Sequence, residues 1–129
     1  MVLTADDARN IADAFRQISV AVGQYRFSNW NALSNSQRGE LEDSEWTLLN
    51  YSSDFITQAV GLTLNDAQGD LQKLLDATKQ AASAVSTIAS INKVISITGA
   101  VMKLGAAIAS ENPGMIVTAT GGVYSAVAA

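Results

Sequence analysis

The residues best suited to chemistry are three glutamates near the start of a predicted helix, Glu40, Glu42 and Glu45. Glu42 and Glu45 lie one helical turn apart, so their carboxylates could share a hard cation or act as general acid and base. Neither role has a complement, because no second acidic helix supplies further ligands and no residue is placed to orient a base. Since the helix dipole stabilises negative charge in the first two turns, we predict that these are solvated side chains at the helix start.

Other catalytic and metal-binding groups are missing, because the sequence contains no histidine and no cysteine. This composition excludes the usual zinc sites, Ser-His-Asp and Cys-His catalysis, and Glu-x-x-His di-iron sites. Asp66 and Asp70 lack the ligand pattern of a calcium loop, and Lys103, between Gly99 and Gly105, lacks the spacing of a phosphate-binding loop. The sequence therefore predicts a protein that is not an enzyme, with no cofactor, no metal and no small-molecule substrate.

Length and charge limit the organisation and the partners. A chain of 129 residues with 48% hydrophobic content predicts one domain spanning residues 1–129. The net charge is −4 and the basic residues are scattered singly, which argues against a nucleic-acid partner. The first residues lack the pattern of a secretory signal, so the cytoplasm is the default location, whereas a toxin-like module would be secreted.

Apolar residues recur with helical period through residues 1–93, which predicts amphipathic helices. The first helix should begin at Ala5, after Thr4 as its cap, and end near Trp30. A polar cluster follows, in which Ser34 or Ser36 can cap the next helix. The predicted buried stripe of the first helix comprises Ala8, Ile11, Phe15, Ile18, Val22 and Tyr25.

The second helix should run from about Gln37 to about Val60 and stop at Gly61. Its apolar face is broad, because three further apolar residues lie beside the main stripe. The main stripe comprises Leu41, Leu48, Tyr51, Phe55, Ala59 and Leu62, and the face is widened by Trp46, Leu49 and Ile56.

The third helix, capped by Thr63 or Asn65, keeps a three-four apolar alternation from Leu64 to Ile95. No breaker interrupts this pattern until the glycines that follow. We therefore expect a bend or break only near residues 96–99, with helix resuming to about Ser110.

The last part of the chain differs sharply in charge, because Lys103 and Glu111 are the only charged residues from Val94 to Ala129. So apolar a stretch must lie inside the protein, against a partner, or in lipid. We predict that it forms a hairpin, residues 94–129, that packs in the core or carries the interaction. Its candidate residues are Val94, Ile95, Ile97, Gly99, Val101, Met102, Leu104, Gly105, Ile108, Met115, Ile116, Val117, Val123 and Tyr124.

The turn of this hairpin is residues 111–114, which contain the only proline. The segment after it has two interpretations, a helix with Asn112 as cap and Pro113 at its first position, or a β-hairpin around Gly121 and Gly122. The helix is favoured because everything before it is helical. The predicted fold is an all-α, up-and-down antiparallel bundle of four to five helices.

Aromatic residues in helical spacing are ordinarily core residues, and this interpretation is the simpler one for the first two helices. The alternative concerns Phe27 and Trp30, which lie beside the polar turn that ends the first helix. These two side chains would then form an exposed anchor at one end of the bundle, for a partner or for a bilayer surface.

As helices, the two arms of the apolar hairpin would be about 25 Å and about 22 Å long, against about 30 Å of bilayer hydrocarbon. Small residues four apart, such as Gly122 and Ala126, allow close helix contacts in lipid and in a soluble core alike. In architecture, amphipathic helices shielding a Gly/Ala-rich hairpin resemble the colicin pore-forming domains and other α-helical pore-forming toxins. The resemblance covers residues 94–129 and implies a hairpin that leaves the soluble fold to enter membranes.

Two functions follow as expectations. The first is a non-enzymatic bundle that associates through its apolar hairpin, as a homo-oligomer or with a protein partner. The alternative is a membrane-active, pore-forming protein that inserts residues 94–129. Under either, replacing Gly99 or Gly105 by Leu should overfill close contacts of the hairpin and lower the melting temperature.

Overall fold

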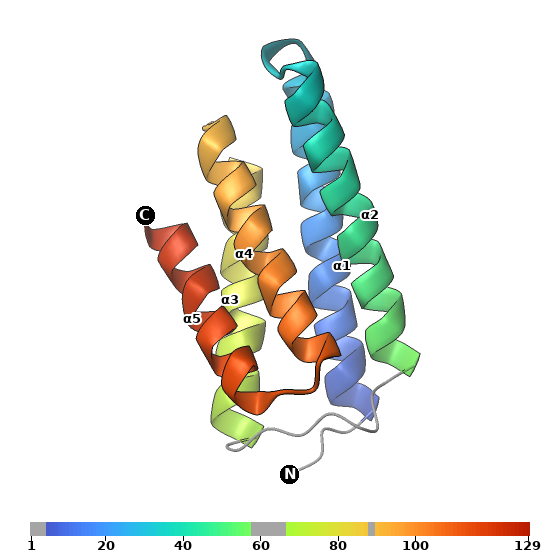
Figure 1. Cartoon of the computed structure of the whole chain (residues 1–129), viewed down its shortest axis with the longest axis vertical. Helices are drawn as coiled ribbons and strands as arrows, with labels where there is room; N and C mark the ends of the chain where they lie inside the picture. Colours follow the sequence, from blue (N-terminus) through green and yellow to red (C-terminus); the bar gives the residue numbers. More distant parts are fainter. Residues whose placement is uncertain (1–4, 58–66, 88–89) are drawn as a thin grey trace.

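The computed structural model describes residues 5–57, 67–87 and 90–129, and within them it contains α-helices, one short 3₁₀ helix and no strand (Figure 1). The prediction of an all-α bundle is confirmed. The elements are α1 (Ala5–Ser28), η1 (Trp30–Ala32), α2 (Asn35–Thr57), α3 (Ala67–Thr87), α4 (Ile91–Ala109) and α5 (Pro113–Ala128).

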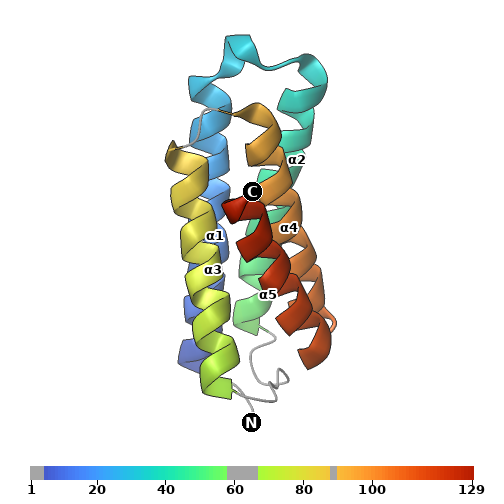
Figure 2. The ribbon, with the colours of Figure 1, turned by 90° about the vertical axis from the view of Figure 1, so that its left-hand side faces the viewer.

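Successive helices run in opposite directions, as an up-and-down bundle requires (Figures 1 and 2). Helix α1 packs against α2 and α3, and α4 packs against the same two helices, which closes a four-helix bundle. Helix α5 lies outside this bundle, over the seam between α3 and α4. Its neighbours, α3 and α4, both lie on its inner side.

The core is built from the predicted stripe of α1 and from the facing sides of the other helices. Phe15, Ile18 and Val22 are fully buried, as are Leu48 of α2 and Leu74 of α3. A single cluster of buried apolar side chains joins all five helices. The apolar period of the sequence thus identifies the inner faces correctly.

The predicted width of the α2 face is wrong. Trp46 is 61% exposed and Leu49 is also exposed, although both were expected to extend the buried arc. The reason is that α2 has two helical neighbours, α1 and α4, and these cover only one side of it. The burial predicted for the Ile56 side chain is not tested, and Ala59 and Leu62 lie outside the described residues.

The helix starts follow the predicted capping chemistry. Helix α1 begins at Ala5. Ser34 caps α2, since its Oγ accepts a hydrogen bond from the Gln37 N–H while the Gln37 side chain accepts one from the Ser34 N–H. The predicted signals at Thr4, Gly61 and Thr63 or Asn65 lie outside the described residues.

The predicted break near residues 96–99 is wrong, because all four lie inside α4. The change of direction comes earlier, between the end of α3 at Thr87 and the start of α4 at Ile91. Ser90 caps α4, its hydroxyl accepting from the Lys93 N–H at 3.4 Å. A serine cap, rather than glycine, thus defines this turn, and α4 starts three residues before the expected boundary at Val94.

The last segment is a helix, and the β-hairpin interpretation is wrong. Asn112 Oδ1 accepts a hydrogen bond from the Met115 N–H at 3.1 Å, and Pro113 occupies the first helical position. Glu111 has a φ of 57°, the left-handed conformation that lets the chain reverse between α4 and α5. These residues together fold the apolar segment into a helical hairpin.

Candidate functional site

The α4–α5 hairpin divides the predicted interaction residues between the core and the surface. Eight of them are buried in the bundle's own core and are not accessible to a partner in this fold: Val94, Ile97, Val101, Leu104, Gly105, Ile108, Ile116 and Val123. The other six are partly or fully exposed: Ile95, Gly99, Met102, Met115, Val117 and Tyr124. Only these six residues of the predicted set can contact a partner in this fold.

Helix α5 is a surface helix without a charged residue. It buries only Ile116, Thr120 and Val123, and Met115 is 52% exposed. The bundle itself therefore hides much of α4 from solvent but only one stripe of α5. Surface helices of soluble bundles usually carry charges opposite their buried stripe, so this uncharged surface distinguishes α5.

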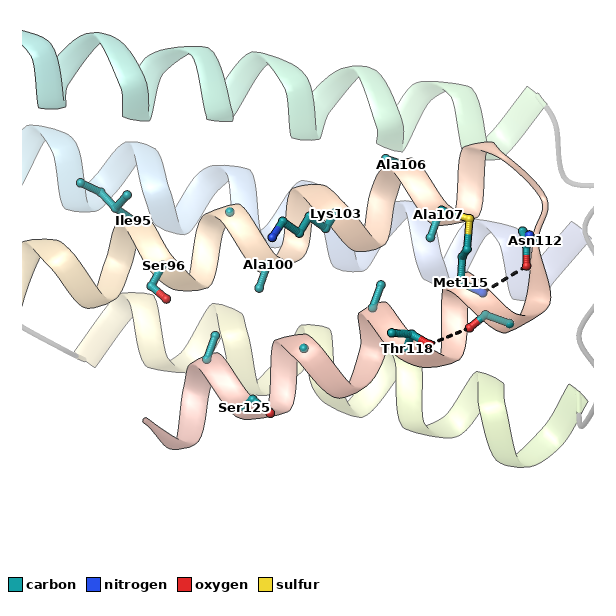
Figure 3. Close-up of a pocket in the computed structure, with 15 residues that line it drawn as sticks. Ile95, Ser96, Ala100, Lys103, Ala106, Ala107, Asn112, Met115, Thr118 and Ser125 are labelled. Atoms are coloured by element: carbon teal, nitrogen blue, oxygen red, sulfur yellow. Dashed lines mark hydrogen bonds between the residues drawn. The ribbon is translucent and has the colours of Figure 1, made fainter.

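A groove of about 1200 Å³ lies between α4 and α5 on the outside of the bundle (Figure 3). Small side chains dominate both walls, and the lining is mainly apolar. The α4 wall consists of Ile95, Ser96, Gly99, Ala100, Lys103, Ala106 and Ala107, and the α5 side of Asn112, Gly114, Met115, Thr118, Ala119, Gly122, Ser125 and Ala126.

The two glycines predicted to sit in close helix contacts behave differently. A Cβ on Gly105 would lie 2.6 Å from the Tyr51 ring and 3.1 Å from the Phe15 ring, so this glycine does permit a close contact. A Cβ on Gly99 would meet no atom within 4 Å, nor would one on Gly122. The prediction is therefore wrong for Gly99, which lines the groove instead.

Lys103 is the one charged residue that lines this groove. Its side chain is exposed and lies along α4 (Figure 3). Within the part of the chain that the structure describes, the ion pairs are Arg9–Asp6 and Arg26–Glu45, so Lys103 has no acidic partner there. The groove is thus apolar with one unpaired positive charge.

Tyr124 ties α5 to α3. Its hydroxyl lies 2.8 Å from Asp76 Oδ2 and 3.0 Å from the Lys73 carbonyl oxygen, and it can donate to either. Burial, the hydrogen bond to Asp76 and the negative charge of Asp76 all raise the pKa of Tyr124 above its ordinary value. The docked position of α5 therefore favours the neutral phenol.

The aromatic anchor predicted at the C-terminal end of α1, Phe27 and Trp30, is exposed. Phe27 is 68% and Trp30 42% exposed, and their rings stack with centroids 6.4 Å apart. The Arg26 guanidinium lies 4.6 Å from the Phe27 ring centre, and that of Arg38 lies 4.5 Å from the Trp30 ring centre. The prediction of core packing is therefore wrong for Phe27 and Trp30 and correct for Phe15. Phe27 and Trp30, with the arginines beside them, form a second exposed surface that is aromatic and positively charged.

Beneath this surface, Arg26 is held against α2. Its Nε donates to Glu45 Oε2 at 2.6 Å, and this hydrogen bond raises the pKa of the guanidinium above its ordinary value. Gly23 makes room for the carboxylate, since a Cβ there would lie 2.5 Å from Glu45 Oε1. Glu45 is thus a structural partner of α1. The prediction of a solvated residue at the helix start is wrong for it, and no acidic residue lies in the first turn of α2.

The three glutamates do not converge on one site. Glu45 points at α1, whereas Glu40 lines a smaller groove between α2 and α4, and Glu42 is exposed. Among the described residues no group of three acidic side chains is placed to hold a metal ion. Asp66 lies outside the described residues.

No known family, characterised protein or solved structure matches this chain. Among the described helices, α4 alone is long and apolar enough to cross a membrane, and 44% of its apolar window is buried inside the bundle. The candidate residues chosen from the sequence left out small residues of the groove such as Ser96, Ala100, Thr118 and Ser125. Their small size and their recurrence at helical spacing opposite the buried stripe were the available signal.

Proposed function

We propose that this protein acts through non-enzymatic protein–protein association, with the outer groove of the α4–α5 hairpin as the binding surface. The observation that carries the proposal is the combination of a charge-free surface helix with a groove lined by small apolar residues. Hydration of such an apolar surface is unfavourable. A partner that covers the surface removes apolar area from water, and this burial stabilises the complex. A second copy of the chain is the partner on which we base the test.

The groove can accept a helix of a partner protein because small side chains line it. Gly99 and Gly122 lack side chains, and Ala100, Ala119 and Ala126 carry only a methyl group. Large side chains of a partner helix can therefore reach the floor between α4 and α5, as in helix-in-groove recognition. Met115 at one end adds an adaptable apolar contact.

The test fills the groove without touching the core. Gly122→Leu places a large side chain in the groove, where a Cβ meets no atom within 4 Å. Gly121→Leu is the matched control, since Gly121 is equally open but lines a different groove, between α5 and α3. Both substitutions replace glycine by a better helix former, so neither should unfold α5.

Sedimentation equilibrium gives the readout. The wild-type mass should rise with concentration, the Gly122→Leu variant should shift towards the monomer, and Gly121→Leu should behave as the wild type. A wild-type chain that stays monomeric at every concentration contradicts self-association through this groove, and so does an oligomer that tolerates both substitutions.

The second candidate is the membrane-active protein, which the length and apolar composition of α4 favour. In this function the α4–α5 hairpin leaves the bundle and enters a bilayer. Leakage of dye from liposomes, together with quenching of a label on the hairpin by lipid-bound quenchers, tests it. A chain that binds no vesicle between acidic and neutral pH excludes this candidate.

A further inference from the structure

We infer that the occupant of the α4–α5 groove is the outer face of α2 from a second copy, with Trp46 as its central side chain. The inference rests on the proposed function and names the surface that the groove receives. We call the exposed residues around this tryptophan, which are Glu42, Asp43, Trp46, Leu49 and Asn50, the α2 ridge. In an α-helix these residues lie three or four positions from Trp46 and share its face.

The α2 ridge presents large apolar side chains, whereas the groove is lined mainly by small ones. Trp46 is 61% exposed, and Leu49, one turn further on, is exposed as well. Tryptophan is the residue most enriched at the energetic centre of protein interfaces.

Two copies of the groove do not complement each other. Both are concave, so packing one on the other leaves the small residues around Gly99 and Gly122 without contacts. Such pairing also brings the two Lys103 side chains onto the same covered surface. A convex aromatic ridge fills the groove instead, because its large side chain replaces the volume that glycine and alanine leave open.

Charge selects between the two exposed aromatic surfaces of this chain. Trp30 is flanked by Arg38, whose charge repels Lys103 in the groove. Arg26 beside Phe27 is already paired with Glu45. Trp46 is flanked by acidic residues one turn before it, Glu42 and Asp43. The groove carries one unpaired positive charge and the α2 ridge carries negative charge, so only the second pairing is electrostatically complementary.

The first measurement uses the two tryptophans as separate probes. In Trp30→Phe, Trp46 is the only tryptophan, and its emission should shift to shorter wavelength as the protein is concentrated, because the indole leaves water. In the matched variant Trp46→Phe, the remaining Trp30 should show no such shift. Emission from Trp46 that is independent of concentration while the mass rises overturns the inference.

The second measurement compares self-association constants. Trp46→Ala should weaken association by about tenfold or more, as expected for a central aromatic residue. Phe27→Ala is the matched control, since Phe27 is also a highly exposed aromatic, and it should leave the constant unchanged. A larger effect at Phe27 than at Trp46 overturns the inference.

Charge reversal tests whether Lys103 of one copy faces Glu42 and Asp43 of the other. Lys103→Glu alone, and the pair Glu42→Lys with Asp43→Lys alone, should each weaken association by about two- to fivefold at low salt. The triple variant should recover much of the loss, since it restores opposite charges with exchanged signs. Absence of recovery in the triple variant counts against this pairing.

The outcomes separate this inference from the proposed function. If Gly122→Leu weakens association and Trp46→Ala does not, the groove is an interface and the α2 ridge is not its occupant. If neither the wild type nor any variant associates, the proposed self-association fails and the inference fails with it. Vesicle binding by the wild type without self-association overturns both.

Discussion

The α1–α2 pair and the α4–α5 pair are both antiparallel helical hairpins, but different forces hold them. Across α1 and α2, the Ser19 hydroxyl donates to the Glu45 carbonyl at 2.9 Å and the Ser52 hydroxyl donates to the Ala12 carbonyl at 2.7 Å. The Arg26–Glu45 ion pair adds a third polar link. The α4–α5 pair instead packs mainly through aliphatic and small side chains around Ile116 and Val123.

This difference separates the two hairpins in what they can offer to other molecules. The outer surfaces of α1 and α2 carry acidic and basic residues that water solvates well. The α5 surface has no charge, and the groove beside it has only Lys103. Polar links fix the first hairpin as scaffold, and its exposed apolar residues Trp46 and Leu49 stand among charged ones. The charge-free surface of α5 is stabilised when a partner covers it.

The largest expected effect tests whether α4 belongs to the scaffold. Gly105→Leu should lower the free energy of unfolding by about 3 kcal/mol, because the new side chain collides with Tyr51 and Phe15. Urea unfolding measures it. Gly99→Leu, in the same helix but in open space, is the control and should not lower stability. Equal losses at both positions would show that α4 packs differently.

The next effect concerns the polar link of the first hairpin. Glu45→Ala should cost about 2 kcal/mol, between the values for exposed and buried ion pairs, because it leaves the largely buried Arg26 without its partner. Glu42→Ala removes an exposed carboxylate of the same helix and should change stability little. A similar result for both, measured by chemical unfolding, would remove the contrast between the two hairpins.

A smaller effect concerns the link between α5 and α3. Tyr124→Phe should cost about 1 kcal/mol at neutral pH, since it removes the hydrogen bond to Asp76 and Lys73. The pKa of Tyr124 is raised in the folded state from 10.0, so its contribution is complete below pH 10 and is lost as pH rises through the raised value. The difference between wild type and variant should therefore shrink above pH 10. A difference that stays constant across this range contradicts the link.

The smallest effect compares open glycines in the two hairpins. Gly39→Ala in α2 and Gly122→Ala in α5 should each raise the free energy of unfolding by about 0.5–1 kcal/mol, because alanine favours helix and neither Cβ meets an atom. Thermal melting compares them. A loss at Gly122 alone would mean that the groove is closed in solution by its own walls.

Most of the fold could be predicted from periodicity and capping. The stripe of α1, the cap at Ser34 and the start of α5 at Asn112 and Pro113 all depend on residues close together in the sequence. The turn before α4 was missed because Ser90 is a weak signal without a nearby glycine or proline. Local chemistry therefore predicts helix ends only where a strong cap or breaker is present.

The candidate site was less predictable, because exposure depends on which helices become neighbours. Trp46 lies beside the apolar face of α2 in the sequence pattern, yet no helix covers it. Gly99 and Gly105 have the same residue type in the same helix, but only Gly105 faces α1 and α2. Periodicity gives the angle of a residue around its helix and does not give the partner at that angle.

The outer position of α5 also affects how the chain assembles during translation. Helices α1 to α4 leave the ribosome before α5, and together they can close a four-helix bundle. The seam between α3 and α4 then stays open until Ile116 and Val123 emerge and dock. A chain whose α5 has not yet docked therefore exposes an apolar furrow between α3 and α4.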